Sequence, residues 1–241
     1  MHFDGPMIAG GHPYELAALL NAEAPAMLPT GVAALDEFTG GIEPGSLWAI
    51  SGLAGIGVSG LAFALAANAA SDGDVVVCNG HIPSRVLARR LAALAGKERR
   101  LRVASWFSLL PEPPDGLGDG TLEQADLVVV DTWDETWHDA TWPATRAELT
   151  RKLRWLRHLG RENGTAIVLT SRMQQTQSDD VLSWMHEAFD DAADVFIAIT
   201  ATEDTRVGTP TGVRAIVRSR SVGRRVFRLT GGSRAQLTPE P

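Results

Sequence analysis

The sequence predicts an α/β domain in which a mostly parallel sheet is covered by helices on both faces and ends in an antiparallel hairpin. Short apolar segments alternate along the chain with helical segments of about ten residues or more, the pattern of βαβ crossovers. These apolar segments are nearly continuous, as expected for strands buried on both faces. The composition, 44% hydrophobic and 21% charged over 241 residues, is typical of one globular domain.

The chain divides into three predicted parts, which are an N-terminal arm with a short helix at 1–28, the core domain at 29–232 and a flexible tail at 233–241. The arm helix is expected at 14–23, where Leu16, Leu19 and Leu20 share one face. A helix with one apolar face needs a surface on which to lie. We see no internal repeat and no long linker.

The core elements follow from apolar periodicity and from glycine and proline boundaries. In chain order we predict a helix at 33–38, a strand at 47–51, a helix at 58–70, a strand at 74–78, a helix at 83–95, a strand at 126–131, a helix at 145–161, a strand at 166–170, a helix at 179–189, and strands at 195–200, 213–218 and 225–229. The strand at 74–78 is marked by three valines between Gly73 and Gly80. A turn-rich loop at 111–120 separates two of the elements.

Charge and cysteine content narrow the functional classes. The formal net charge of −7 argues against a protein that coats nucleic acid over its whole surface. The single Cys78 excludes an intramolecular disulfide and fits a reducing compartment, so we expect a cytoplasmic protein. Neither a membrane-spanning segment nor a signal peptide is expected.

The segment from Thr205 to Arg234 is strongly basic despite the acidic total. It contains no acidic residue and eight arginines, at positions 206, 214, 218, 220, 224, 225, 228 and 234. Arginines 214 to 228 alternate with apolar residues in the predicted strands. Two interpretations stay open, a solvated sheet face and a face that contacts DNA or another subunit.

A glycine-rich loop follows the strand at 47–51 and precedes the helix at 58–70. Its pattern matches G-x-x-x-x-G-K-[ST] at Gly52, Gly57 and Ser59, with Gly55 between them. Glycines allow backbone N–H groups to turn toward an anion, and the following helix presents its positive end. ATP is therefore a candidate ligand of this loop.

Val58 stands at the lysine position of this pattern, and the substitution is decisive for the mechanism. A lysine there neutralises charge on the β and γ phosphates, whereas valine offers only methyl groups. Lys97 and Lys152 lie far away in sequence, on predicted helices. Three interpretations stay open, namely a tight turn without a ligand, nucleotide binding without efficient hydrolysis, and turnover with a cation supplied from elsewhere.

Asp131 ends the strand at 126–131. An aspartate at this place could hold hydrated Mg²⁺ together with Ser59, through water. The alternative is a strand-end acid that caps the next turn.

Residues 28–47, with the sequence LPTGVAALDEFTGGIEPGSL, resemble the entry segment of the RecA-like motor domain of DnaB-type replicative helicases. The resemblance runs to about residue 230, and it implies a RecA-like P-loop-type fold. Residues 192–195 resemble the family's entry to a late core strand, and residues 217–221 resemble its Lys-x-Arg-Asn stretch. In the family the arm helix packs on the adjacent subunit and helps to close a ring.

The resemblance also assigns roles to individual residues. It places Arg220 at the arginine that acts on a neighbouring subunit's γ-phosphate, and Arg218 at the preceding basic position. His81 lies nearest to the family's glutamate, which polarises the attacking water. Histidine can act as a base, but the simpler interpretation is that this chain has lost both the lysine and the glutamate.

Two further sets of residues were considered as sites. Trp133, Trp137 and Trp142 lie among acidic residues, which favours core or subunit packing, then a surface for a protein partner, over stacking on nucleic-acid bases. The pairs Asp134/His138 and Cys78/His81 have metal-like spacings but too few ligands.

The sequence therefore favours a DnaB-helicase-like protein with a degenerate phosphate loop, acting as an oligomeric ring or as a partner subunit in DNA replication or recombination. It could co-assemble with a related ATPase, bind single-stranded DNA and use ATP with Mg²⁺ or no cofactor. One alternative is an active ATP-dependent DNA helicase or translocase. The other is a non-catalytic adaptor that binds a protein through the tryptophan loop.

Overall fold

The computed structural model defines the architecture of most of the core domain. It describes residues 26–79, 82–95, 100–104, 125–132, 145–173, 179–201, 212–230 and 236–239. The predicted arm helix, His81, Lys97 and the tryptophan loop lie outside the described residues.

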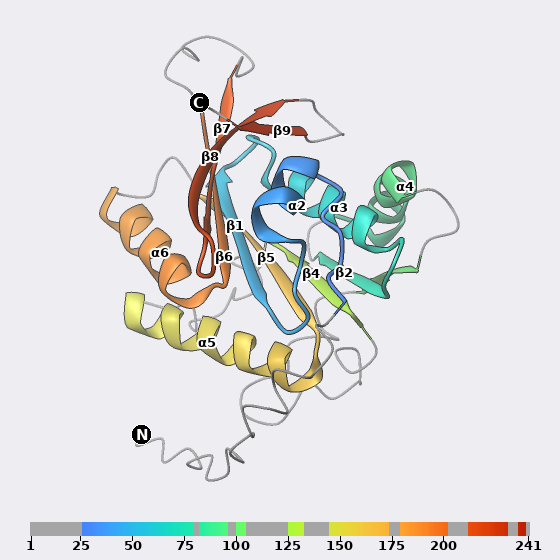
Figure 1. The fold of residues 1–241 in the computed structure, drawn as a ribbon, viewed down its shortest axis with the longest axis horizontal. Coiled ribbons are helices and arrows are strands. Elements are labelled where there is room, and N and C mark those ends of the chain that lie inside the picture. Colours follow the sequence, from blue (N-terminus) through green and yellow to red (C-terminus); the bar gives the residue numbers. More distant parts are fainter. Residues whose placement is uncertain are drawn as a thin grey trace.

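One mixed sheet organises the described chain (Figure 1). Its strands are β1 (Leu47–Leu53), β2 (Val75–Asn79), β3 (Leu101–Ala104), β4 (Leu127–Asp131), β5 (Ala166–Met173), β6 (Val195–Ala201), β7 (Val213–Ser219), β8 (Gly223–Thr230) and β9 (Gln236–Pro239). They lie in the order β3-β2-β4-β5-β1-β6-β7-β8-β9. Strands β1 to β6 are all parallel to one another. The pairs β6-β7, β7-β8 and β8-β9 are antiparallel. The predicted parallel sheet with a C-terminal hairpin is confirmed.

Helices cover both faces of the sheet, as predicted. They are α2 (Ala33–Thr39), α3 (Val58–Ala69), α4 (Ser84–Ala95), α5 (Arg146–Asn163) and α6 (Asp179–Ala192). Helices α2, α3 and α4 lie on one side, and α5 and α6 lie on the other (Figure 1). Each side has its own apolar core, one built around α3 and one around α5 and α6.

Helix α5 illustrates how local sequence fixes an element. The Thr145 hydroxyl accepts a hydrogen bond from the Glu148 backbone N–H at 3.3 Å, which caps the first turn. Leu149 and Leu153 are fully buried against the sheet, as the leucine stripe predicts. Gly164 ends the helix in the left-handed region, at φ 67°.

The segment before β1 is held against α3. Leu28 and Ile42 exchange backbone hydrogen bonds of 3.0 and 2.8 Å, which close the segment into a loop around α2. The Asn68 side-chain amide donates to the Thr30 carbonyl at 3.0 Å. Gly31 has φ +68°, and a Cβ atom there would lie 2.1 Å from Asn68 Cγ, so this position requires glycine.

Two strands were not predicted. β3 lies at one end of the sheet and is only partly buried, so its sequence lacks a continuous apolar run. β9 pairs with β8 at the other end, and the prediction of a flexible tail at 233–241 was therefore wrong for Gln236–Pro239. Edge strands bury less side-chain area than central ones, so they leave a weaker pattern in the sequence.

No helix among the described residues combines the length and the apolarity needed to cross a membrane.

Candidate functional site

The glycine-rich loop connects β1 to α3 at the end of the sheet where the parallel strands finish, which we call the carboxyl end. Gly55 and Gly57 have φ +83° and +112°, in the left-handed region that favours glycine. A Cβ atom on Gly52 would lie 2.7 Å from the Ile199 carbonyl oxygen, so this glycine is required by packing against β6. Gly57 is also the N-cap of α3 and leaves the first turn without a side-chain cap. The predicted strand-loop-helix geometry is present.

Val58 belongs to the apolar core at the start of α3. Its side chain is 3% exposed and is part of the same cluster as Ile50 and Ile199. The Val58 side chain therefore supplies neither a cation nor a hydrogen-bond donor to an anion in the loop.

Ser59 and Asp131, the two predicted metal-site residues, are linked by Arg172. The Arg172 Nη2 atom lies 3.3 Å from Ser59 Oγ and donates a hydrogen bond to it. The same nitrogen lies 3.8 Å from Asp131 Oδ2. The arginine side chain is 30% exposed, whereas Asp131 is fully buried.

The sheet register explains this juxtaposition. β5 lies between β1 and β4, with Arg172 opposite Gly52 and Leu169 opposite Val130. Thr170 and Arg172 are two residues apart on one strand and therefore point to the same face. Both contact Asp131, because β4 ends beside them.

Neutral donors also surround Asp131. Its Oδ2 accepts a hydrogen bond from the Asn79 amide at 2.5 Å, and its Oδ1 accepts one from the Thr170 hydroxyl at 2.7 Å. The side-chain oxygen Oδ1 of Asn79 accepts a hydrogen bond from the Ile82 backbone N–H at 2.6 Å, which orients the side-chain amide. This network on β2, β4 and β5 satisfies both oxygens of the carboxylate.

Thr132, directly after Asp131, adopts a strained backbone conformation. Its φ of 56° is unusual for a β-branched residue. Two hydrogen bonds of 2.7 Å hold it, one from its backbone N–H to the Thr170 hydroxyl and one from its own hydroxyl to the Asp131 carbonyl. Strain of this kind persists where the surroundings fix the backbone, and it is frequent at functional sites.

The predicted Mg²⁺ role of Ser59 and Asp131 does not fit this donor set. Mg²⁺ requires short, nearly octahedral oxygen contacts and keeps several waters. Asp131 has no exposed surface, and a guanidinium lies between it and Ser59. Among the described residues, no group of three or more His, Cys, Asp or Glu side chains could hold a metal.

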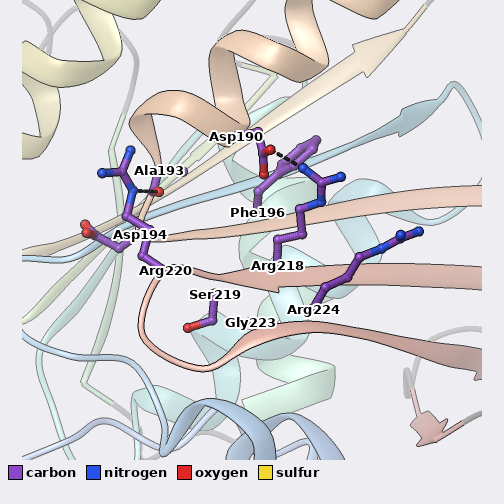
Figure 2. Close-up of a pocket in the computed structure, with 9 residues that line it drawn as sticks. All are labelled: Asp190, Ala193, Asp194, Phe196, Arg218, Ser219, Arg220, Gly223 and Arg224. Carbon is purple, nitrogen blue, oxygen red and sulfur yellow. Dashed lines mark hydrogen bonds and ion pairs between the residues drawn. The ribbon is translucent and has the colours of Figure 1, made fainter.

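The predicted trans-acting arginines lie at the opposite, amino end of the sheet. Ser219 pairs with Val195 at the start of β6, so Arg218 near the end of β7 and Arg220 directly after β7 lie away from the phosphate loop. Figure 2 shows both side chains turned toward the end of α6. Arg220 Nε donates to the Ala193 carbonyl at 2.7 Å, and Arg218 pairs with Asp190. Within one chain, these arginines and the phosphate loop do not meet.

A shallow cavity of about 260 Å³ lies beside these arginines (Figure 2). Its lining residues are Asp190, Ala193, Asp194, Phe196, Arg218, Ser219, Arg220, Gly223 and Arg224. Burial lowers the pKa of Arg220 from its ordinary value, and the nearby Arg157 lowers this pKa further, while Asp194 opposes the shift. The cavity therefore combines arginines with carboxylates that already pair with arginines.

The basic segment forms a patterned face on β7 and β8. Arg214 is paired in register with Arg228, and Arg218 with Arg224, so four exposed arginines point to the same face as Phe196. Adjacent like charges on a sheet are unfavourable without counter-charges. Asp190 on α6 supplies one counter-charge, to Arg218.

Arg172, Asn79 and Thr170 were missed from the sequence. Each lies at or near the carboxyl end of a parallel strand, where α/β proteins place their binding residues. The polar run Thr170-Ser171-Arg172 after an apolar strand was the available signal. Of the two lysines considered from the sequence, Lys152 lies on α5.

Comparison with known proteins identifies the fold. No protein-family model matches the chain, and no curated protein matches it in sequence. Many solved structures are similar, among them the ATPase domain of G40P, with a TM-score of 0.63 over 88% of this chain and 91% of that chain at 14% identity. The chain therefore has the α/β fold of a RecA-like ATPase domain, as predicted.

Proposed function

We propose that this protein is a DnaB-helicase-like, RecA-fold nucleotide-binding subunit with impaired ATP hydrolysis. It acts in the cytoplasm as an oligomeric ring, or as a partner of a related ATPase, in DNA replication or recombination. The observation that carries the proposal is a glycine loop with the backbone shape of a phosphate loop, in which a buried Val58 stands at the position of the lysine.

Binding and hydrolysis make different demands on this loop. Gly55 and Gly57 keep the left-handed conformations that shape the loop, and α3 begins directly after it. Hydrolysis also requires charge neutralisation in the transition state, and the loss of one preorganised donor typically lowers the rate about 10²- to 10³-fold. Nucleotide occupancy with slow turnover follows from this combination.

Assembly gives Arg218 and Arg220 a role in the proposal. They lie at the amino end of the sheet, remote from the phosphate loop of their own chain. An arginine in this place can reach a nucleotide only on a neighbouring subunit. The arginine face of β7 and β8 supports contact with a neighbouring subunit or with single-stranded DNA.

Calorimetric titration with ATP, with Mg²⁺ and separately with EDTA, tests the nucleotide site. We expect saturable binding in at least one condition and little turnover in a matched hydrolysis assay. Gly55→Asp should abolish binding, because it places a negative charge in the loop. Gly55→Asn is the matched control, since Asn and Asp both tolerate the left-handed region and no atom lies within 4 Å of a Cβ there.

The other outcomes separate the competing functions. No binding at millimolar ATP in either condition would overturn the proposal and favour a non-catalytic adaptor. Fast ATP turnover stimulated by single-stranded DNA would instead support an active translocase. Light scattering at tens of micromolar, with and without ATP, tests self-assembly, and a monomer throughout would restrict the proposal to a co-assembled partner subunit.

A further inference from the structure

Arg172 lies between the two residues that P-loop proteins use to hold Mg²⁺, the loop Ser and the strand-end Asp. Its Nη2 atom is 3.3 Å from Ser59 Oγ and 3.8 Å from Asp131 Oδ2. We infer that the Arg172 guanidinium takes the place of the metal, so that the loop binds a nucleoside triphosphate without a divalent cation. The part of this inference that concerns the nucleotide rests on the proposed function.

The surroundings of Asp131 favour an internal cation over a hydrated metal. Both carboxylate oxygens already accept short hydrogen bonds, from Asn79 and Thr170. Asp131 is fully buried, so the waters that Mg²⁺ retains have no access to it from solvent. A guanidinium within 4 Å also repels a divalent cation.

The position of Arg172 also suits a polyphosphate. It is in register with Gly52, the first glycine of the loop, and its side chain is 30% exposed. The arginine side chain carries a permanent positive charge and planar N–H donors, which suit phosphate oxygens. β5 thus places a cation beside a loop that lacks the lysine at position 58.

The first test compares ATP affinity in Mg²⁺ and in EDTA. We expect the affinity of the wild-type chain to agree within about threefold between the two conditions. Arg172→Gln should lower the affinity in EDTA roughly ten- to hundredfold, the loss expected for a charge-assisted hydrogen bond. Arg89→Gln, an equal charge change at an exposed position of α4, should leave both affinities unchanged. Binding by the wild type that requires Mg²⁺ would overturn the inference and leave the proposed function intact.

A second test needs no nucleotide. The melting temperatures of Asp131→Asn, Arg172→Gln and the double variant form a cycle in the free protein. We expect the double variant to lose clearly less stability than the sum of the single variants, because each single change leaves one charge without its partner. Additive losses would show that Arg172 is not the counter-ion of Asp131 and would overturn the inference. Coupled losses without any ATP binding would support the internal cation, and they would overturn both the nucleotide part of the inference and the proposed nucleotide function.

Discussion

A largely buried aspartate lies at each end of the parallel strands, and its carboxylate is stabilised differently at the two ends. Asp131 at the carboxyl end is fully buried, and its oxygens accept hydrogen bonds from Asn79 and Thr170, with one guanidinium at 3.8 Å. Asp194 at the amino end is 17% exposed, and its closest charged contact is Arg157 at 2.6 Å. One carboxylate is held mainly by neutral dipoles, and the other mainly by cations.

The amino end holds a structural junction, whereas the carboxyl end is where we propose that a ligand binds. Asp194 also accepts from the Leu47 backbone N–H at 3.0 Å, and its own carbonyl accepts from the Arg220 backbone N–H at 3.0 Å. It therefore ties β1, α5 and the end of β7 together. Asp131 binds to fewer elements and lies beside the strained Thr132 and the phosphate loop. At the amino end, Asp194 holds several elements together. At the carboxyl end, the backbone of Thr132 is strained, as is frequent at functional sites.

Asp194→Ala should give the largest loss of stability. The change leaves the guanidinium of Arg157, which is only 18% exposed, without its partner and removes the acceptor for Leu47. We expect the free energy of unfolding, measured in urea, to fall by about 3 kcal/mol. Asp190→Ala, which breaks a more exposed pair with Arg218, should cost no more than about 1 kcal/mol. Equal losses in the two variants would contradict the junction role.

Asp131→Asn should lower the free energy of unfolding by less than Asp194→Ala does, by about 1–2 kcal/mol. An asparagine keeps one acceptor oxygen, and the Thr170 hydroxyl can rotate to accept from the new amide. The same urea titration measures this loss. A loss as large as that of Asp194→Ala would show that charge, not neutral hydrogen bonding, dominates at the carboxyl end.

Most of the sheet could be predicted because its strands are continuous apolar runs. β2 and β4 are buried along their full length, and such strands leave a clear pattern in the sequence. β3 and β9 were not predicted, because strands at the ends of a sheet bury less side-chain area and are stabilised by pairing with a neighbour. That pairing depends on residues distant in the chain.

The candidate site was also predicted only where its residues are close together in the sequence. The glycine loop is local, so spacing alone indicated Gly52, Gly57 and Ser59. The contact of Arg172 with Ser59 joins residues 113 positions apart, and it depends on β5 lying between β1 and β4. No local pattern contains that strand order. Turnover with a cation supplied from elsewhere was one of the interpretations left open, and the sequence did not indicate Arg172 as a candidate for that cation.

His186 should make stability depend on pH at the α6 side of the molecule. Burial lowers the pKa of His186 below its ordinary value of 6.5, and the charge of Arg218 lowers it further, although Asp190 opposes the shift. The unfolded chain therefore binds the proton more readily, and stability falls as the pH drops below about 6.5. We expect His186→Gln to flatten the dependence of the melting temperature on pH between about pH 7 and 5. A slope that His186→Gln leaves unchanged would contradict this origin of the pH dependence.

Ser171→Ala should give the smallest effect, and one of opposite sign. The Ser171 hydroxyl is buried and has no hydrogen-bond partner among the described residues, and the same holds for Ser51 directly across on β1. Removal of an unsatisfied buried hydroxyl should raise the free energy of unfolding by about 0.5–1 kcal/mol. The adjacent Thr170→Val is the matched control, and it should lower the free energy by about 1–2 kcal/mol because it removes a donor to Asp131.

The opposite changes in the free energy of unfolding that are expected for Ser171→Ala and Thr170→Val test whether the polar network lies on one face of β5. Thr170 points toward Asp131, and Ser171 points to the opposite face, which packs against α5 and α6. If Ser171→Ala lowers stability as Thr170→Val does, the Ser171 hydroxyl has a partner in solution. The polar network at the carboxyl end would then extend through both faces of the sheet, and the functional site would not be confined to the face that carries Asp131 and Arg172.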